Sequence, residues 1–284
     1  MAIEFMKLQG LGNDFIIVTV EDAHALRGVS EFAQTICERN FGAGADGVVF
    51  ISRSSQDDSD FASRIFNADG GEAEISGNGT RCAAAFIYYR EMWDAEEIRI
   101  ATAAGIKRGR LIDRDNLRFE FQFDMGEPVL KSEYLPMSLP EPLDSVVSYP
   151  LKIGDEGIEV TCVSMGNPHC TVFLPDLDKV NLSEMGPRIE GHTVFPNRTN
   201  VEFARVLSSE EIEVRFWERG VGRTLSSGTG SCASAIAAML NELTGRSVRV
   251  RTAGGTLQVE WQQDNRVALT GPAEVIYEGR WLRD

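Results

Sequence analysis

The sequence predicts an α+β protein built from two similar domains, and three observations support this fold class. A phrase containing Ser-Gly-x-Gly occurs twice, around Ser76 and again around Ser227. Each copy follows a strand-like apolar segment and a polar loop, and leads into an Ala-rich run typical of a helix. Short segments rich in β-branched and aromatic residues surround both copies. A duplicated loop–helix junction indicates two related halves, each with one long helix.

Bulk composition is that of a soluble globular protein. The chain has 284 residues, of which 43% are hydrophobic and 25% charged, enough for one large domain or two ordinary ones. Its net charge of -15 argues against nucleic-acid and anionic-membrane partners. No apolar run approaches the roughly 18 residues of a membrane span. The five cysteines are scattered and odd in number, which predicts reduced thiols and a cytoplasmic protein.

The first half contains seven expected strands and two expected helices, judged from residue type and partial alternation. The helices are expected at Val29–Arg39 and Gly79–Glu91. The strands are expected at Ile3–Lys7, Phe15–Val20, Val48–Ser52, Phe61–Asn67, Ile98–Thr102, Lys107–Ile112 and Leu117–Phe123. An irregular stretch that contains proline, Gly126–Pro150, is interpreted as the passage between domains.

The second half repeats this order, with one expected helix at Gly230–Thr244. Its strands are expected at Ile158–Ser164, Thr171–Leu174, Asn200–Val206, Ile212–Trp217, Val248–Thr252, Thr256–Trp261, Arg266–Thr270 and Ala273–Tyr277. The last of these is expected to return to the first strand of the chain. The predicted domains are therefore residues 1–124 with 272–284, and residues 125–271.

The two Ser-Gly-x-Gly phrases lie at the expected helix starts, where N–H groups without intrahelical partners and partial positive charge favour an anion such as a carboxylate. Ordinary capping by serine is the alternative interpretation for one copy, but two copies in matching contexts favour a shared site. Gly42–Gly47 fits the dinucleotide-binding spacing, yet it follows a helix and precedes a strand, so it is interpreted as a turn.

Three further residues are candidates. His169 shares one short loop with Asn167, and Arg219 follows a strand end where its planar donor array suits a carboxylate. The cysteines near His169 do not have zinc-ligand spacing, so no metal site is predicted.

Together these phrases resemble the diaminopimelate epimerase family, cofactor-free amino-acid racemases of lysine synthesis. The resemblance spans the chain and is carried by Lys7–Phe15, Gly42–Gly47, Ile65–Gly70, Gly77–Cys82, Met165–His169, Asn200, Glu218–Gly220 and Gly228–Cys232. It implies two pseudo-symmetric domains, each a barrel-like, mostly antiparallel sheet around a central helix, with a small-molecule substrate between them. It implies no cofactor, and a homodimer is compatible with it.

By this resemblance, Ser76 and Ser227 occupy the two positions of the proton-transferring bases, flanked by His169 and Glu218. The implied substrate-binding residues are Asn13, Asn67, Gly77, Asn78, Asn167, Asn200, Glu218, Arg219, Gly228 and Thr229. The family uses cysteine at both base positions. A thiol suits a helix N-terminus because its pKa falls there, whereas an alcohol is a much weaker acid and needs a neighbour to take its proton.

Four hypotheses follow from the two serines. The first is an epimerase acting on diaminopimelate through Ser76 and Ser227, impaired or assisted by His169 and Glu218. The second is a related isomerase or dehydratase on another amino or hydroxy acid. The third is an amino-acid binder without activity, and the fourth is deliberate replacement of both cysteines. The retained polar residues favour a diaminopimelate-like ligand: Asn67, Asn167, Asn200 and Arg219.

Overall fold

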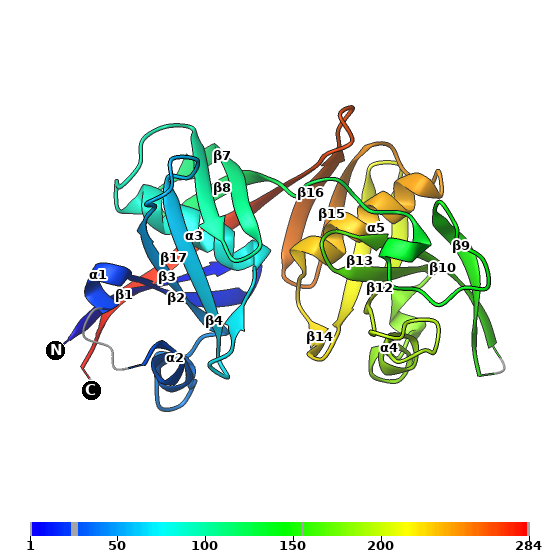
Figure 1. Cartoon of the computed structure of the whole chain (residues 1–284), viewed down its shortest axis with the longest axis horizontal. Coiled ribbons are helices and arrows are strands. Elements are labelled where there is room, and N and C mark those ends of the chain that lie inside the picture. The colour runs from blue at the N-terminus through cyan, green and yellow to red at the C-terminus, as the bar shows by residue number, and fades with distance from the viewer. Residues whose placement is uncertain (1, 24–27, 155, 283–284) are drawn as a thin grey trace. The chain divides into compact units, whose positions relative to one another are not determined.

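The computed structural model describes residues 2–23, 28–154 and 156–282 and divides into two compact units, each considered by itself (Figure 1). Unit 1 comprises Met1–Asp124 with Thr270–Asp284, and unit 2 comprises Met125–Leu269.

The elements of unit 1 are β1 (Ile3–Gly10), β2 (Asn13–Thr19), α1 (Val20–Ala23), α2 (Val29–Cys37), β3 (Gly47–Arg53), β4 (Phe61–Asn67), β5 (Glu72–Ala73), α3 (Gly77–Tyr89), β6 (Glu97–Thr102), β7 (Gly105–Asp115) and β8 (Arg118–Asp124). β17 (Val267–Trp281) begins in unit 2 and runs through unit 1.

The elements of unit 2 are η1 (Ser132–Tyr134), β9 (Val146–Ile153), β10 (Glu156–Ser164), β11 (Pro168–Phe173), η2 (Leu177–Lys179), α4 (Leu182–Glu190), β12 (Asn200–Ser208), β13 (Glu211–Glu218), β14 (Gly222–Thr224), α5 (Gly228–Leu240), β15 (Ser247–Thr252) and β16 (Gly255–Trp261).

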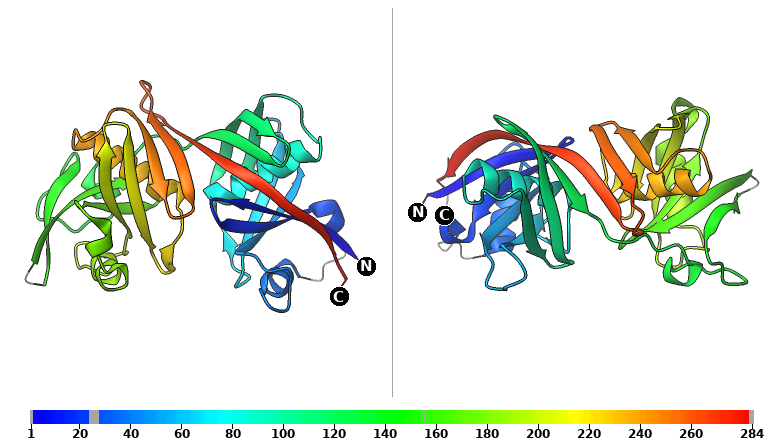
Figure 2. Two further views of the ribbon diagram at one scale, coloured as in Figure 1. Left: turned by 180° about the vertical axis from the view of Figure 1, so that it is seen from behind. Right: turned by 90° about the horizontal axis from the view of Figure 1, so that it is seen from above.

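The strands of unit 1 form a closed ring of eight. The ring runs β1–β2–β3–β4–β6–β7–β8–β17 and closes where β17 pairs with β1. The expected return of the last strand to the first is confirmed: β17 and β1 are antiparallel neighbours, drawn in red and dark blue in Figure 2. Closure satisfies the backbone groups that an open edge would leave without partners.

Unit 2 repeats the pairing pattern of unit 1. In unit 1 the successive pairs are antiparallel, parallel, antiparallel, parallel and antiparallel: β1–β2, β2–β3, β3–β4, β4–β6 and β6–β7. In unit 2 the same order of senses occurs in β10–β11, β11–β12, β12–β13, β13–β15 and β15–β16. The duplication read from two short phrases therefore extends to the fold of both units, and the α+β prediction is confirmed.

Each unit is built around one buried helix. α3 contacts β1, β2, β3, β4 and β8, while α5 contacts β10, β11, β12, β13, β15 and β16. Alanine and glycine are frequent in both helices, which allows strands to approach closely, and most residues of each helix are buried. Both helices end in the same way. The second residue after the helix has a left-handed conformation in each case: Glu91 after α3, with φ 55°, and Glu242 after α5, with φ 57°.

Several boundaries differ from the sequence prediction. α3 and α5 begin at Gly77 and Gly228, because the serine before each is the N-cap rather than part of the preceding loop. The two strands expected at Arg266–Thr270 and Ala273–Tyr277 are one continuous strand, β17. The helix expected over Val29–Arg39 ends at Cys37.

Among the described residues, seven elements were not predicted: α1, α4, β5, β9, β14 and the two 3-10 helices η1 and η2. β9 begins inside the stretch that was interpreted as irregular and includes Pro150. In the described residues β9 pairs only with β10, and a proline is tolerated on an edge strand because no second neighbour requires its missing N–H. α4 contains Gly186 and Pro187, which local propensity disfavours in a helix, and its buried residues pack into the unit 2 core.

Candidate active site

The two serines that the resemblance places at the base positions both cap helices. Ser76 has extended backbone angles before α3, and its Oγ accepts a hydrogen bond from the Gly79 N–H at 3.1 Å. Ser227 does the same before α5, accepting from the Gly230 N–H at 3.3 Å. The N–H groups of the first helical turn have no partner within the helix, so each unit presents one anion-favouring terminus beside a serine hydroxyl.

The Ser227 hydroxyl also faces a carboxylate. Glu218 ends β13, and its Oε2 lies 3.5 Å from Ser227 Oγ, a long and weak hydrogen bond. β14 pairs back on β13, which brings the end of β13 to the start of α5. Of the two assistants considered for an alcohol base, Glu218 is therefore the one that contacts Ser227.

His169 uses both ring nitrogens within unit 2. Its Nδ1 lies 2.6 Å from Glu202 Oε1, and its Nε2 lies 2.9 Å from Asn167 Oδ1. Both His169 and Glu202 are 1% exposed. Burial raises the pKa of Glu202, and the neighbouring His169 lowers it only in part. His169 is thus a partner of Glu202 and Asn167, and its ring does not reach a serine of its own unit by a hydrogen bond in the described residues.

Asn200 fixes the loop that carries Arg219. Its Nδ2 donates to the Pro168 carbonyl at 2.9 Å, and its Oδ1 accepts from the Arg219 backbone N–H at 2.9 Å. The exposed Arg219 guanidinium donates to the Asn197 carbonyl at 3.2 Å. Buried Glu190 supports the same loop by accepting from the Gly220 N–H at 3.1 Å. The loop backbone is held while the Arg219 side chain remains at the surface.

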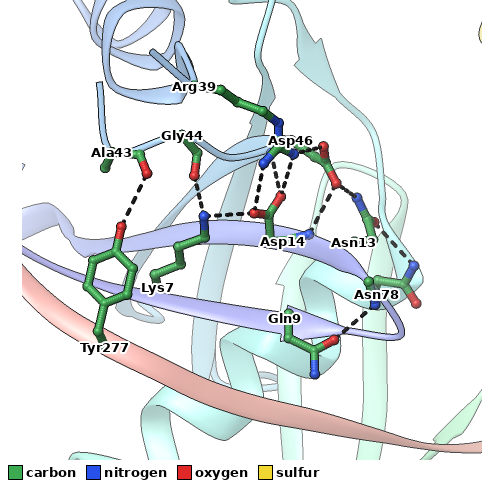
Figure 3. Close-up of polar contacts among 11 residues, drawn as sticks. Lys7, Gln9, Asn13, Asp14, Arg39, Ala43, Gly44, Asp46, Asn78 and Tyr277 are labelled. Atoms are coloured by element: carbon green, nitrogen blue, oxygen red, sulfur yellow. Dashed lines mark hydrogen bonds and ion pairs between the residues drawn. The ribbon is translucent and has the colours of Figure 1, made fainter. Parts of the chain in front are cut away.

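Asn13 lies at the centre of a charged network in unit 1 (Figure 3). Its Nδ2 donates to Asp46 at 2.7 Å, and its Oδ1 accepts from Asn78 Nδ2 at 3.1 Å. Arg39 pairs with both Asp46 and Asp14, at 2.7 and 3.0 Å. Both ends of the Asn13 carboxamide are therefore fixed, and Asn78 is tied to Asn13 as well as forming the first turn of α3.

The same network accounts for the glycine-rich turn. Lys7 forms an ion pair with Asp14 at 2.8 Å. Burial alone would raise the pKa of Asp14, but the hydrogen bonds from Arg39 and Lys7 outweigh it and lower that pKa. Gly44 has φ +74°, a left-handed conformation that suits glycine, and lies between α2 and β3. The interpretation of Gly42–Gly47 as a helix-to-strand turn is confirmed, and Asp46 gives it a role in holding Asn13.

The predicted residues fall into two groups, one in each unit. In unit 1, Ser76, Gly77 and Asn78 are consecutive, Asn13 bonds to Asn78, and Asn67 is exposed at the end of the neighbouring strand β4. In unit 2, Glu218 contacts Ser227, Asn167 contacts His169, and Asn200 contacts Arg219. Gly228 and Thr229 are the first residues of α5.

Sequence reasoning missed Glu202, Asp46 and Glu190. The available signal for Glu202 was a single carboxylate in the otherwise apolar run Val201–Ala204 of an expected strand, since charged residues are almost never fully buried unless paired. Asp46 and Glu190 carry no comparable local signal, because their partners lie on other elements.

Other candidates contribute no site. Cys82 is fully buried, and burial raises its pKa to about 12, so it is a packing residue rather than a substitute base. All five cysteines are free and buried. No group of three metal-ligating side chains occurs among residues 2–23, 28–154 and 156–282. Within the same residues, no helix is long and apolar enough to cross a bilayer.

A cavity of about 650 Å³ in unit 1 lies at the opposite end of α3 from Ser76. Phe86 and Ile17 contribute to its lining. Its four charged residues pair with one another, Arg90 with Glu278 at 3.1 Å and Arg280 with Glu4 at 2.6 Å. The cavity is therefore separate from the group around the start of α3.

Comparison with known proteins agrees with these features. A diaminopimelate epimerase from Synechocystis is 44% identical over 99% of both chains, and one from Halothermothrix orenii is 41% identical over 99% of this chain and 98% of its own. Among solved structures, a phenazine biosynthesis protein from Bacillus anthracis has a TM-score of 0.68 at 19% identity, with both chains fully covered. A probable proline racemase from Agrobacterium radiobacter has a TM-score of 0.68 at 14% identity, covering 99% of this chain and 93% of its own.

The structural neighbours share the fold. The sequence profile described as diaminopimelate epimerase matches residues 5–131 and 161–276, which include both serine-capped helices and the residues gathered around them. With the full-length relatives above, this match shows that the chain belongs to the diaminopimelate epimerase family.

Proposed function

We propose that this protein is an isomerase that interconverts LL- and meso-diaminopimelate by moving a proton at Cα, without a cofactor. The observation that supports this most directly is the duplicated helix start, one in each unit with a serine as N-cap. The N–H groups of such a helix start suit a substrate carboxylate, and the serine hydroxyl lies beside them.

The proposed reaction uses one hydroxyl on each face of the substrate. Ser227 Oγ removes the Cα proton while its own proton passes to the Glu218 carboxylate, because an alcohol needs such an acceptor to act as a base. Ser76 Oγ–H delivers a proton to the other face, and His169 is the second group that assists proton transfer. The helix N-termini stabilise the negative charge that develops on the carboxylate during transfer.

The remaining contacts follow the family resemblance. In unit 1 we assign substrate binding to Asn13, Asn67, Gly77 and Asn78. In unit 2 we assign it to Asn167, Asn200, Glu218, Arg219, Gly228 and Thr229. Many amide donors and one exposed guanidinium suit the distal amino-acid end of a diaminopimelate-like ligand. Five free buried thiols support a reducing compartment, and we propose the cytoplasm.

The decisive measurement is exchange of the Cα hydrogen of LL- and meso-diaminopimelate for deuterium in D₂O. We expect slow exchange in the chain as it stands. In the Ser76→Cys/Ser227→Cys double variant we expect an increase of about 10² or more, because thiolates at helix N-termini are better bases than alcohols. Each single variant should gain much less, since one face still depends on an alcohol.

Ser234→Cys is the matched control, because it introduces a thiol inside α5 rather than at its start. It should leave exchange unchanged. A folded double variant that shows no exchange with either stereoisomer would overturn the proposed activity. If that variant still bound diaminopimelate in calorimetry, the chain would be an amino-acid-binding member of the family.

A further inference from the structure

The His169–Glu202 pair is buried as completely as the hydrophobic core around it. His169 lies on β11 and Glu202 on β12, neighbouring parallel strands. Glu202 Oε1 makes the 2.6 Å contact, whereas Oε2 has no hydrogen-bond partner among the described residues although it is inaccessible to solvent. The backbone N–H of Cys170 also acts on the carboxylate and lowers its pKa, but less than burial raises it. A buried carboxylate with one oxygen lacking a partner costs stability, so packing alone does not explain it.

Unit 1 shows that the fold does not require this pair. Glu202 pairs with Phe216 across β12 and β13, and Val49 pairs with Ile65 across β3 and β4 in the same way. Phe216 pairs with Thr224, three positions before Ser227. Ile65 pairs with Ala73, three positions before Ser76, so Phe216 and Ile65 occupy equivalent positions. Val49 is therefore the unit 1 counterpart of Glu202.

By the same register Phe15 is the counterpart of His169. Phe15 pairs with Gly47 at the start of β3, and His169 pairs with Asn200 at the start of β12. Phe15 and Val49 are both buried. One copy of the fold thus fills these two positions with apolar side chains, and the other fills them with a titratable pair.

The hydrogen-bond partners of His169 limit the protonation states that the His169–Glu202 pair can adopt. Asn167 Oδ1 only accepts hydrogen bonds, so the His169 Nε2 that faces it carries a hydrogen. Nδ1 then either donates to an ionised Glu202 or accepts from a protonated one. Both forms keep one proton between Nδ1 and Oε1, and both leave the pair with no net charge. Glu218 also acts on the pair, because its negative charge raises the pKa of Glu202.

We propose that Glu202 is a positioning residue for the reaction: together with Asn167 it holds the His169 ring in one orientation, and it balances the charge when both ring nitrogens carry a hydrogen. The proposal rests on the proposed function, in which His169 assists one of the two proton transfers. Neutral imidazole can carry its hydrogen on either nitrogen, and the group bonded to one nitrogen decides the form of the other. Asn167 and Glu202 each bond to one ring nitrogen, so that together they hold the ring at a fixed angle.

NMR of histidine labelled with ¹⁵N tests the positioning in the ligand-free protein. The chain has three histidines. The variants His24→Gln and His192→Gln identify the signals of His24 and His192, and the remaining signals belong to His169. We expect Nε2 of His169 to be protonated and a strongly downfield proton signal from the short Nδ1–Oε1 contact. Glu202→Gln should abolish that signal, because the amide keeps the shape but cannot share the proton. A His169 with an unprotonated Nε2 would overturn the proposal.

Exchange kinetics test whether the positioning serves catalysis. Measurements use the chain as it stands and the Ser76→Cys/Ser227→Cys variant, so that slow alcohol bases do not hide an effect. Glu202→Gln should lower kcat for Cα–H exchange at least about tenfold and change KM by less than about threefold. Asp60→Asn, which removes a buried carboxylate paired with Arg99 in unit 1, should change neither.

The outcomes separate the two proposals. Unchanged kcat in Glu202→Gln, with exchange intact in the parent, would show that Glu202 is only structural and would overturn its positioning role. Equal losses in Glu202→Gln and Asp60→Asn would do so too, because they would show a general effect on the fold. If neither parent background exchanges Cα–H, the proposed activity fails, and the NMR signals still decide whether Glu202 fixes His169.

Discussion

The helix starts of α3 and α5 share their backbone and differ in the side chains around them. Both serines cap the helix, and both helices sit inside sheets of the same pairing order. In unit 1, the side chains of Phe15 and Ile65 lie next to Gly79 in the first turn of α3, close enough to contact a Cβ at that position. At the equivalent Gly230 the nearest atoms belong to Glu202 and Phe216. The duplicated backbone therefore provides two similar helix starts with apolar neighbours at one and a carboxylate at the other.

This difference supports unequal roles for the two serines in the proposed reaction. Glu218 is positioned to accept the proton of Ser227, whereas its unit 1 counterpart at the end of β4 is Asn67, an amide that cannot act as a base. Inversion at a carbon needs a base on one face and an acid on the other. A fold with two identical halves would lack that distinction, and substitutions at a few equivalent positions supply it.

The largest expected effect is on stability, from replacing the titratable pair by its unit 1 counterparts. His169→Phe or Glu202→Val alone should lower the free energy of unfolding by about 3 to 5 kcal/mol, because each leaves a buried polar partner unpaired. The double variant should lose less than either single variant. Urea unfolding followed by circular dichroism measures all three.

The reverse exchange in unit 1 is the control. Phe15→His with Val49→Glu places a polar pair where the fold has apolar packing, and it should destabilise more than the exchange in unit 2. Strictly additive losses for His169→Phe and Glu202→Val would contradict the equivalence of the two positions.

The next effect is on the rate of proton transfer. Glu218→Gln should lower Cα–H exchange about 100-fold, because the Ser227 hydroxyl loses its proton acceptor. Asn67→Ala should lower the rate by less than tenfold, since Asn67 has no part in moving protons. Deuterium incorporation into meso-diaminopimelate measures the exchange rate of each variant. Equal losses of rate in Glu218→Gln and Asn67→Ala would contradict the distinction between the two serines.

Acid should weaken unit 1 before it affects the Glu202 region. The pKa of Asp14 is lowered in the fold, so its contribution is present above its unfolded value of 3.8 and is lost as pH falls through the folded pKa. The pKa of Glu202 is raised above 4.5, so its contribution is present below that value and is lost as pH rises through the folded pKa.

Hydrogen exchange of backbone amides, corrected for intrinsic rates, resolves the two units. We expect β2 to lose about 2 kcal/mol of protection on acidification below pH 4, the scale of a hydrogen bond to a charged group. Asp14→Asn should remove that dependence. Asp178 in unit 2 also has a lowered pKa through Arg215, but it is 83% exposed and contributes little. Equal acid sensitivity of β2 and β12 would contradict the expectation.

The smallest effect tests the shared backbone. Ser76→Ala and Ser227→Ala should each cost about 1 kcal/mol of unfolding free energy, because each removes one N-cap hydrogen bond. Thermal unfolding measures both. Ser76→Thr and Ser227→Thr retain the capping oxygen and serve as controls. A loss confined to one serine would show that the two helix starts are not equivalent.

Much of the fold was predictable because its signals are local. The bounds predicted for Phe61–Asn67 match β4, and both long helices were located to within a few residues of their ends. Serine caps, alanine runs and β-branched segments act through neighbours in the chain. α4 and β9 were missed because Pro187 and Pro150 disfavour them locally, and packing against the unit 2 core overrides that preference.

The sequence by itself determined the duplication, the two capped helices and the family, because the pattern that predicts each of them lies in contiguous residues. Tertiary structure alone decided which groups meet. Glu202 is 33 positions from His169, and Glu218 reaches Ser227 only because β14 folds back on β13. Strand register selects those partners, and register depends on how both faces of a sheet pack, which no local pattern in the chain records.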